Sequence, residues 1–175
     1  WDLDATRRFQ VAETDAARAA AQVSRDRAQA LIDASWAAYQ VAARLLPDDV
    51  RVVNDAGLVM AYYIRTDIEA AERYFLDAVK DGAVQLQEEM PDDERAMLEE
   101  AWGDAHQNMG IIEMTSRGNP QLARDWFVKS LEIGPPSRNW LKSDVLPLLD
   151  SWIESGARPN ALDAIERRTV WTHNP

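Results

Sequence analysis

Apolar residues recur at intervals of three and four along almost the whole of this 175-residue chain. The positions between them are filled mainly by Ala, Leu, Glu, Arg and Gln, which favour helices. No stretch alternates apolar and polar residues for long enough to form a half-buried strand. The pattern therefore predicts an all-α fold, and the length is that of one domain able to bury its own core.

The first 46 residues contain neither Gly nor Pro, and six acidic side chains balance six basic ones. One continuous helix of up to about 70 Å fits this segment at 1.5 Å per residue. The alternative is a break near Ser24, which would cap a second helix. We favour the single helix, because the segment ARAAAQV contains no residue that favours a turn.

Turn signals become regular after Pro47. The segment PDD and Asn54 begin a helix that continues to Tyr63, RTD forms a turn, and IEAAERYFLDAVK forms the next helix. A long helix follows, with Asp92 as its expected cap and further acids in its first turn, where the helix dipole favours them.

The second half of the chain follows the same plan. SRGNP ends the long helix, and Pro120 suits the first turn of the next one. Gly134 is expected to end that helix. Ser137 is expected to cap the following helix, which Pro147 should kink or delay. These segments predict antiparallel helix pairs joined by short turns.

One pattern recurs in the second helix of each pair. A small residue is followed four positions later by a large one, and a Pro, where present, lies twelve positions after the small residue. The sets are Ser35–Tyr39–Pro47, Ala71–Phe75, Ala123–Phe127–Pro135 and Ala161–Ile165. A small residue lets two helices approach closely, and the large side chain one turn later fills the groove between them.

This recurrence resembles the tetratricopeptide repeat (TPR), an array of helix–turn–helix units with Trp, Leu-Gly and Tyr in the first helix and Ala, Phe and Pro in the second. The residues that carry the resemblance, and that it places between packed helices, are Leu58, Tyr62, Ala71, Phe75, Met109, Gly110, Ala123, Phe127 and Pro135. The departures are Asp55 and His106 in place of Trp, Val59 in place of Gly, Glu113 in place of Tyr, and one extra residue in the turn of the unit around Gly110.

The resemblance implies a TPR-like right-handed superhelix over residues 28–168. Its second helices would lie near residues 31–46, 67–81, 120–133 and 160–168. An N-terminal helix over 1–27 would precede them, either separate or continuous with the first, and a tail over 169–175 would follow. The small residues of successive units are 36, 52 and 38 positions apart, against about 34 in the ideal repeat.

The longest of these intervals contains residues 80–100, which hold eight acids and two bases. Longer helices that meet at an acidic tip would account for the interval. This tip is either a solvated loop or a docking surface for a basic partner.

Catalytic or metal-binding chemistry is not indicated. His106 shares a helix face with Glu99 and Glu113, but this spacing extends over about 21 Å, beyond the reach of one ion. Metal ligands on a helix are three or four residues apart. His106 is therefore expected to pack against the neighbouring repeat. Because there is also no Gly-rich phosphate loop and no signature pairing a nucleophile with a base, we predict a protein that is not an enzyme and uses no metal and no cofactor.

The chain contains seven Trp residues. Trp36 and Trp152 are expected in the core. Trp1, Trp140 and Trp171 lie near ends or turns, where they are either core residues or exposed anchors of an interface.

By resemblance, the first helices would form a concave groove that binds a segment of another protein, so the chain is interpreted as a scaffolding module. The candidate partner-binding residues are Asn54, Met60, Tyr63, Asn108, Ile111 and Met114. An apolar or basic peptide or helical segment is the expected ligand. Capture of a C-terminal carboxylate is disfavoured, because the first helices contain no Lys. Alternatively, the N-terminal helix or a sister chain fills the groove.

Two further roles stay open: a permanent structural subunit of a larger complex, and the recognition domain of a longer enzyme. The net charge of -11 argues against sequence-independent nucleic-acid binding and against an anionic membrane surface. No apolar run is long enough to cross a membrane. The absence of Cys excludes disulfides but fits the cytoplasm and the cell envelope equally. Because the chain begins with Trp1, a processed form or a piece of a longer protein is expected, and its oligomeric state is open.

Overall fold

The computed structural model describes residues 15–65, 67–134, 136–163 and 165, and these residues form helices and no strand. The predicted all-α fold is therefore confirmed. In chain order the elements are α2 (Asp15–Leu45), α3 (Val50–Leu58), π-helical η1 (Val59–Ile64), α4 (Ile68–Gln85), α5 (Asp92–Ile112), π-helical η2 (Glu113–Arg117), α6 (Pro120–Ile133), the 3₁₀ turn η3 (Pro136–Arg138), π-helical η4 (Leu141–Val145) and α7 (Leu146–Ser155).

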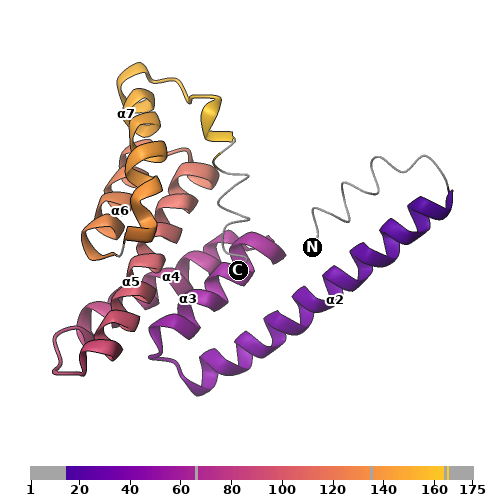
Figure 1. Cartoon of the computed structure of the whole chain (residues 1–175), viewed down its shortest axis with the longest axis horizontal. Helices are drawn as coiled ribbons and strands as arrows, with labels where there is room; N and C mark the ends of the chain where they lie inside the picture. Colours follow the sequence, from indigo (N-terminus) through magenta and orange to yellow (C-terminus); the bar gives the residue numbers. More distant parts are fainter. Residues whose placement is uncertain (1–14, 66, 135, 164, 166–175) are drawn as a thin grey trace.

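The helix α2 runs without interruption for 31 residues. The Ser24 hydroxyl donates back to the Ala20 carbonyl oxygen at 3.1 Å inside this helix, so it caps nothing. The prediction of one long helix is thus confirmed from Asp15 onward, across the expected boundary between residues 27 and 28. One half of α2 packs against α3 and η1, and the other half extends away from the remaining helices (Figure 1).

The other helices pack on their neighbours in the chain. α3 contacts α4 and α5, α4 contacts α5, and α5 contacts α6, which in turn contacts α7 (Figure 1). The expected second helices near 67–81 and 120–133 correspond to α4 and α6. Of the expected helix near 160–168, residues 161–163 and 165 are helical. The tail over 169–175 lies outside the described residues.

Short polar side chains begin several of these helices. Asp49 caps α3 by accepting a hydrogen bond from the Val52 N–H at 2.9 Å, so Asn54 lies inside this helix and not at its start. Asn119 caps α6 by accepting from the Leu122 N–H at 3.2 Å. Pro120 occupies the first turn of α6 and Gly134 ends it, as predicted.

Of three further expected helix starts, two differ from the prediction and one agrees with it. Pro91, not Asp92, precedes α5, and no side chain caps that end, although the acids do fill the first turn as predicted. Ser137 lies within η3 and does not open the following helix. Pro147 lies in the first turn of α7, directly after η4, so the predicted delay of this helix is confirmed.

Two hairpins, α3–η1–α4 and α5–η2–α6, are built alike. In each, the π-helical end stops at a residue in the left-handed conformation, Arg65 (φ 57°) or Gly118 (φ 63°), whose N–H donates to a carbonyl oxygen five residues earlier. An Asp or Asn then caps the second helix, Asp67 in the first hairpin and Asn119 in the second. Left-handed turns of this kind reverse the chain within a few residues.

A glycine faces a phenylalanine in both hairpins. A Cβ atom on Gly57 would lie 2.7 Å from Phe75 Cε1, and one on Gly110 would lie 2.7 Å from Phe127 Cε1. Both rings are completely buried. Gly57, and not Val59, therefore occupies the place of Gly110, which corrects the register expected from the sequence.

The two hairpins also differ in the turn. The left-handed residue lies eight positions after the glycine in both hairpins. The cap then follows two positions after Arg65 but one position after Gly118. The turn of the first hairpin is thus one residue longer than the turn of the second. Of the expected packing residues, Leu58 is half-buried, Pro135 lies outside the described residues, and the rest are buried.

Candidate partner-binding face

Four of the six predicted partner-binding residues are buried. Asn54 and Ile111 are 2% exposed, Met114 is 1% exposed and Asn108 is fully buried. Only Met60 and Tyr63 are half-buried and reach the surface. The sequence placed all six on an open groove, and this is wrong for the four buried residues, because both helix faces at these positions meet neighbouring elements.

The two asparagines belong to a chain of hydrogen bonds across four elements. The Tyr62 hydroxyl donates to Asn108 Oδ1 at 2.7 Å, and Asn108 Nδ2 donates to Asn54 Oδ1 at 3.0 Å. Asn54 Nδ2 reaches Asp55 Oδ1 at 3.3 Å, and the Tyr39 hydroxyl donates to Asp55 Oδ2 at 3.2 Å. This polar chain joins α2, α3, η1 and α5, so it fixes where these helices lie relative to one another.

The electrostatics of the polar chain keep its hydroxyl groups protonated. Burial, with Asp104 nearby, raises the pKa of the Tyr62 phenol far above its usual value, so Tyr62 remains a donor. Burial also raises the pKa of the Asp55 carboxyl, although the hydrogen bond from Tyr39 and the charge of Arg51 oppose this. The amide nitrogen of Asn108 is bonded to Asn54 and that of Asn54 to Asp55, which leaves both asparagines unsuited to capturing a ligand carboxylate.

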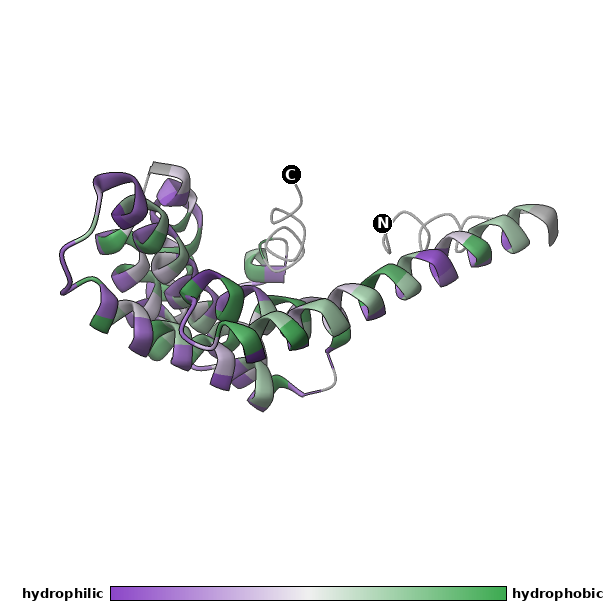
Figure 2. Cartoon of the chain, turned by 90° about the horizontal axis from the view of Figure 1, so that it is seen from below, coloured by the Kyte–Doolittle hydropathy of each residue, from purple (hydrophilic) through white to green (hydrophobic). Residues whose placement is uncertain are grey.

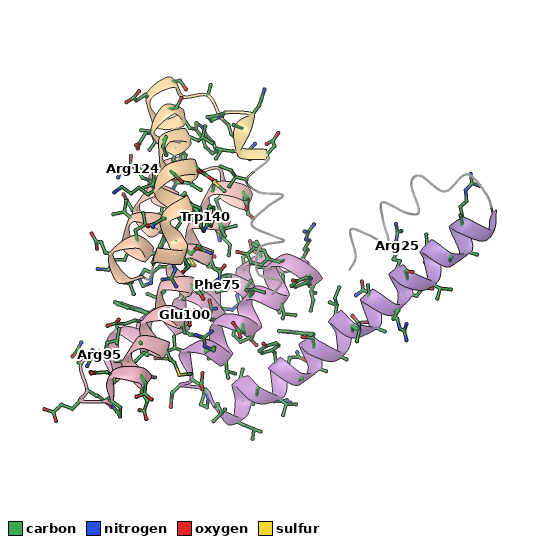
Figure 3. The ribbon with its side chains drawn as sticks, in the orientation of Figure 1. Arg25, Phe75, Arg95, Glu100, Arg124 and Trp140 are labelled. Carbon is green, nitrogen blue, oxygen red and sulfur yellow. The ribbon has the colours of Figure 1, made fainter. Side chains whose placement is uncertain are left out.

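Half-buried apolar side chains from two distant parts of the chain border one buried cluster. Leu58, Ala61 and Tyr63 come from α3 and η1, whereas Trp140, Leu146 and Leu148 come from the segment around η4 and α7. The cluster beneath them includes Tyr62, Ile111, Met114, Leu141 and Val145. We name these six half-buried residues the apolar rim; Trp140 is labelled in Figure 3.

His106 lies between two indole rings at the α5–α6 contact. Its ring centroid is 4.9 Å from that of Trp102 and 5.5 Å from that of Trp126. Nδ1 lies 2.8 Å from the Trp102 carbonyl oxygen, an acceptor, so this nitrogen carries the proton. Burial lowers the pKa of the imidazole, which favours the neutral ring. His106 therefore packs mainly within its own hairpin, whereas the sequence analysis placed it against a neighbouring repeat.

Arg138 makes a buried contact that the sequence did not indicate. It is 3% exposed, and its Nη2 donates to the Glu100 carbonyl oxygen at 2.6 Å and to Asp104 Oδ1 at 2.7 Å. Its guanidinium lies against Gly103 and Gly134, where a Cβ atom would collide with it. In the sequence, the only indication of this contact was a glycine in each of two consecutive helical segments, with Arg138 four positions after the second glycine.

The acidic segment around residues 80–100 forms the α4–α5 tip. Arg95 holds the loop by donating to the carbonyl oxygens of Leu86 (3.2 Å) and Glu88 (3.1 Å), as its position in Figure 3 illustrates. Trp102 crosses the hairpin and donates from Nε1 to the Val79 carbonyl oxygen at 2.7 Å. The predicted meeting of two long helices is confirmed; docking of a basic partner at this tip stays a prediction.

The tryptophans divide as follows. Trp152 is buried as predicted, with Arg158 5.7 Å above its ring. Trp36 is half-buried and meets Tyr74 edge-on at 6.2 Å. Trp140 is half-buried in the rim, and Trp1 and Trp171 lie outside the described residues.

Within the described ranges, no group of three or more His, Asp or Glu side chains is arranged to hold a metal ion. None of the helices described combines the length and the apolar character that crossing a membrane would require. Comparison of the chain with family models, with curated proteins and with solved structures finds no match in any of the three.

Proposed function

We propose that this protein is a non-catalytic interaction module of the TPR-like kind, which binds an apolar segment of a partner along the apolar rim. The matched hairpins support the repeat interpretation. They share a left-handed turn, an Asx cap and a Gly–Phe contact in the same order, as stacked repeats do.

The observation that carries the proposal is the apolar rim itself. Residues of η1 and of the η4–α7 segment are more than 70 positions apart in the chain, yet they border the same buried cluster. Half-buried Tyr and Trp side chains on a rigid, fully packed base are typical hot spots of protein interfaces. The polar chain beneath η1 supplies that rigidity. The net charge of -11 favours a partner whose apolar segment is flanked by basic residues.

A random peptide library displayed on phage provides the first test. Peptides selected on the wild-type chain would be re-measured by fluorescence polarisation against the rim variant Tyr63→Asp/Leu146→Asp. The matched control is Leu76→Asp/Leu122→Asp, which changes two exposed leucines on α4 and α6. We expect apolar peptides with basic flanks, an affinity loss of about tenfold or more in the rim variant, and unchanged affinity in the control.

An equal loss in both variants would contradict binding at the rim, as would selected peptides that ignore both substitutions. The far-ultraviolet circular dichroism of each variant should match the wild type, because neither pair of substitutions removes a fully buried side chain.

The alternative role, a permanent structural subunit, is favoured by one separate observation. Five of the ten large apolar side chains that are exposed in the described part of the chain lie between residues 23 and 46, on α2 and just after it. A subunit built into an assembly would cover them. A chain that is monomeric and fully folded by itself would argue against this role.

A further inference from the structure

The helix α2 presents apolar residues on two faces, and none of the helices that the structure describes covers the second face. The first face carries Trp36 and Tyr39, which contact Tyr74 and Asp55. Val41 lies two residues beyond Tyr39, or about 200° further around the helix. Val23 lies 18 residues before Val41, which is five complete turns, so the two valines share that second face.

The second face has the spacing of a coiled-coil seam. Its residues alternate in steps of three and four over three heptads: Ala20, Val23, Arg27, Ala30, Ala34, Ala37 and Val41. All seven are exposed. Leu31 and Leu45, which are 57% and 74% exposed, widen one edge. A seam of this period is the pattern with which one helix packs against another.

The charged residues on and beside the seam indicate which helix would pack against it. Asp26 and Asp33 line the opposite edge of the seam, where Gln22 and Gln29 donate to them at 2.7 and 2.9 Å. Arg27, in the seam, forms no ion pair with any of the described residues. A helix that complements this face must offer small apolar residues opposite the alanines and a carboxylate near Arg27, and a second copy of α2 offers both.

We propose that two copies of this chain associate through α2, antiparallel, about a two-fold axis near residue 32. In this register Val23 of each copy lies opposite Val41 of the other, and Ala30 lies opposite Ala34. Each Arg27 is then about 6 Å along the axis from Asp33 of the second copy, within the reach of its side chain. A parallel pair would place Arg27 directly against Arg27, and such a like-charge contact inside a seam is unfavourable.

The half of α2 that extends beyond the other helices makes this pairing sterically open. Figure 2 shows α2 projecting from the body of the molecule with hydrophobic residues along its length. The helix bodies would lie at opposite ends of the pair, on the faces away from the seam. The pairing therefore leaves the apolar rim accessible, and it is independent of the proposed function.

Sedimentation equilibrium of the whole chain at concentrations up to about 1 mM tests the association. We expect a monomer–dimer equilibrium, and a dissociation constant raised about tenfold or more in Val23→Glu/Val41→Glu. The control Leu122→Glu/Ile153→Glu alters two exposed apolar residues on α6 and α7 with the same charge change. A wild-type monomer throughout, or a dimer that the seam variant does not weaken, overturns the proposal.

The absence of Cys makes the orientation directly measurable. In the antiparallel pair, Leu31→Cys lies beside its own copy at the two-fold axis and should oxidise to a covalent dimer, whereas Val23→Cys should not. Covalent dimers from Val23→Cys but not from Leu31→Cys would overturn the antiparallel arrangement.

The charge contact has its own test. Arg27→Glu should raise the dissociation constant of the dimer several-fold, because the new carboxylate lies near Asp33 of the second copy. Arg27→Glu/Asp33→Arg should restore the affinity. A double variant as weak as the single one would overturn the contact.

Discussion

The first and second hairpins use the same device with different residues. Both pack a glycine against a buried phenylalanine and both turn through a left-handed residue, but that residue is Arg65 in the first hairpin and Gly118 in the second. At the position four residues before the glycine, the first hairpin has Val53 and the second has His106. The comparison teaches that the Gly–Phe contact is the same in both hairpins. The turn residue and the residue four positions before the glycine differ between them.

The largest effect is expected where the hairpins agree. Phe75→Ala and Phe127→Ala should each lower the free energy of unfolding by about 3–5 kcal/mol, because each removes a completely buried ring. Urea denaturation of the two variants measures this. A cost in one hairpin that is less than half of that in the other would break the equivalence of the two contacts.

The next effect concerns the glycines. Gly57→Ala and Gly110→Ala should each cost about 1–3 kcal/mol, because the new methyl group would press on the aromatic ring. Val59→Ala is the control, because the sequence had placed Val59, and not Gly57, at the position of Gly110. If Gly57→Ala were tolerated without loss of stability, Gly57 would not be the counterpart of Gly110.

The turn residues should respond in opposite directions. Gly118→Ala should cost about 1 kcal/mol, because an L side chain at this positive φ is strained. Arg65→Gly should relieve a similar strain, offset in part by loss of the 2.7 Å hydrogen bond from Arg65 Nε to the Tyr62 carbonyl oxygen. Thermal unfolding of both variants checks the signs, and stabilisation by Gly118→Ala would contradict the turn geometry.

The smallest expected effect is a dependence of stability on pH that comes from His106, which only the second hairpin contains. Because burial lowers the pKa of His106 in the folded chain, the unfolded chain binds a proton more readily. The contribution of the neutral ring to stability is complete above the unfolded pKa of about 6.5 and is lost as the pH falls below it. His106→Val, which copies Val53, should therefore reduce the difference between the unfolding temperatures at neutral and mildly acidic pH. An unchanged difference would exclude His106 as its source.

Local signals predicted much of this fold. Pro120 and Gly134 mark the two ends of α6, and the run without Gly or Pro marks α2, because such features act through the backbone of the residue itself. The sequence matched Val59, and not Gly57, to Gly110, because both residues have apolar neighbours in the chain. Only the contact of Gly57 with Phe75 distinguishes the two.

The candidate site was harder to predict than the fold. Asn54 and Asn108 are polar residues on first helices, which suggested an exposed groove. Their burial depends on partners far away in the chain: Asn108 bonds to Tyr62, 46 positions before it, and to Asn54, 54 positions before it. The burial of Arg138 was not predicted either, because its hydrogen-bond acceptors lie on α5, 34 and 38 positions earlier in the chain.

The contacts of Arg138 reach past the helix that precedes it in the chain. A stack of repeats in which each unit touches only its neighbours can lose its last unit and keep the rest. Here a polypeptide cut before residue 138 would leave the Glu100 carbonyl oxygen and the Asp104 carboxylate without this partner, and an empty space between Gly103 and Gly134. The smallest autonomous folding unit that includes α5 and α6 is therefore expected to end after residue 138, and the described helices to melt in a single cooperative step.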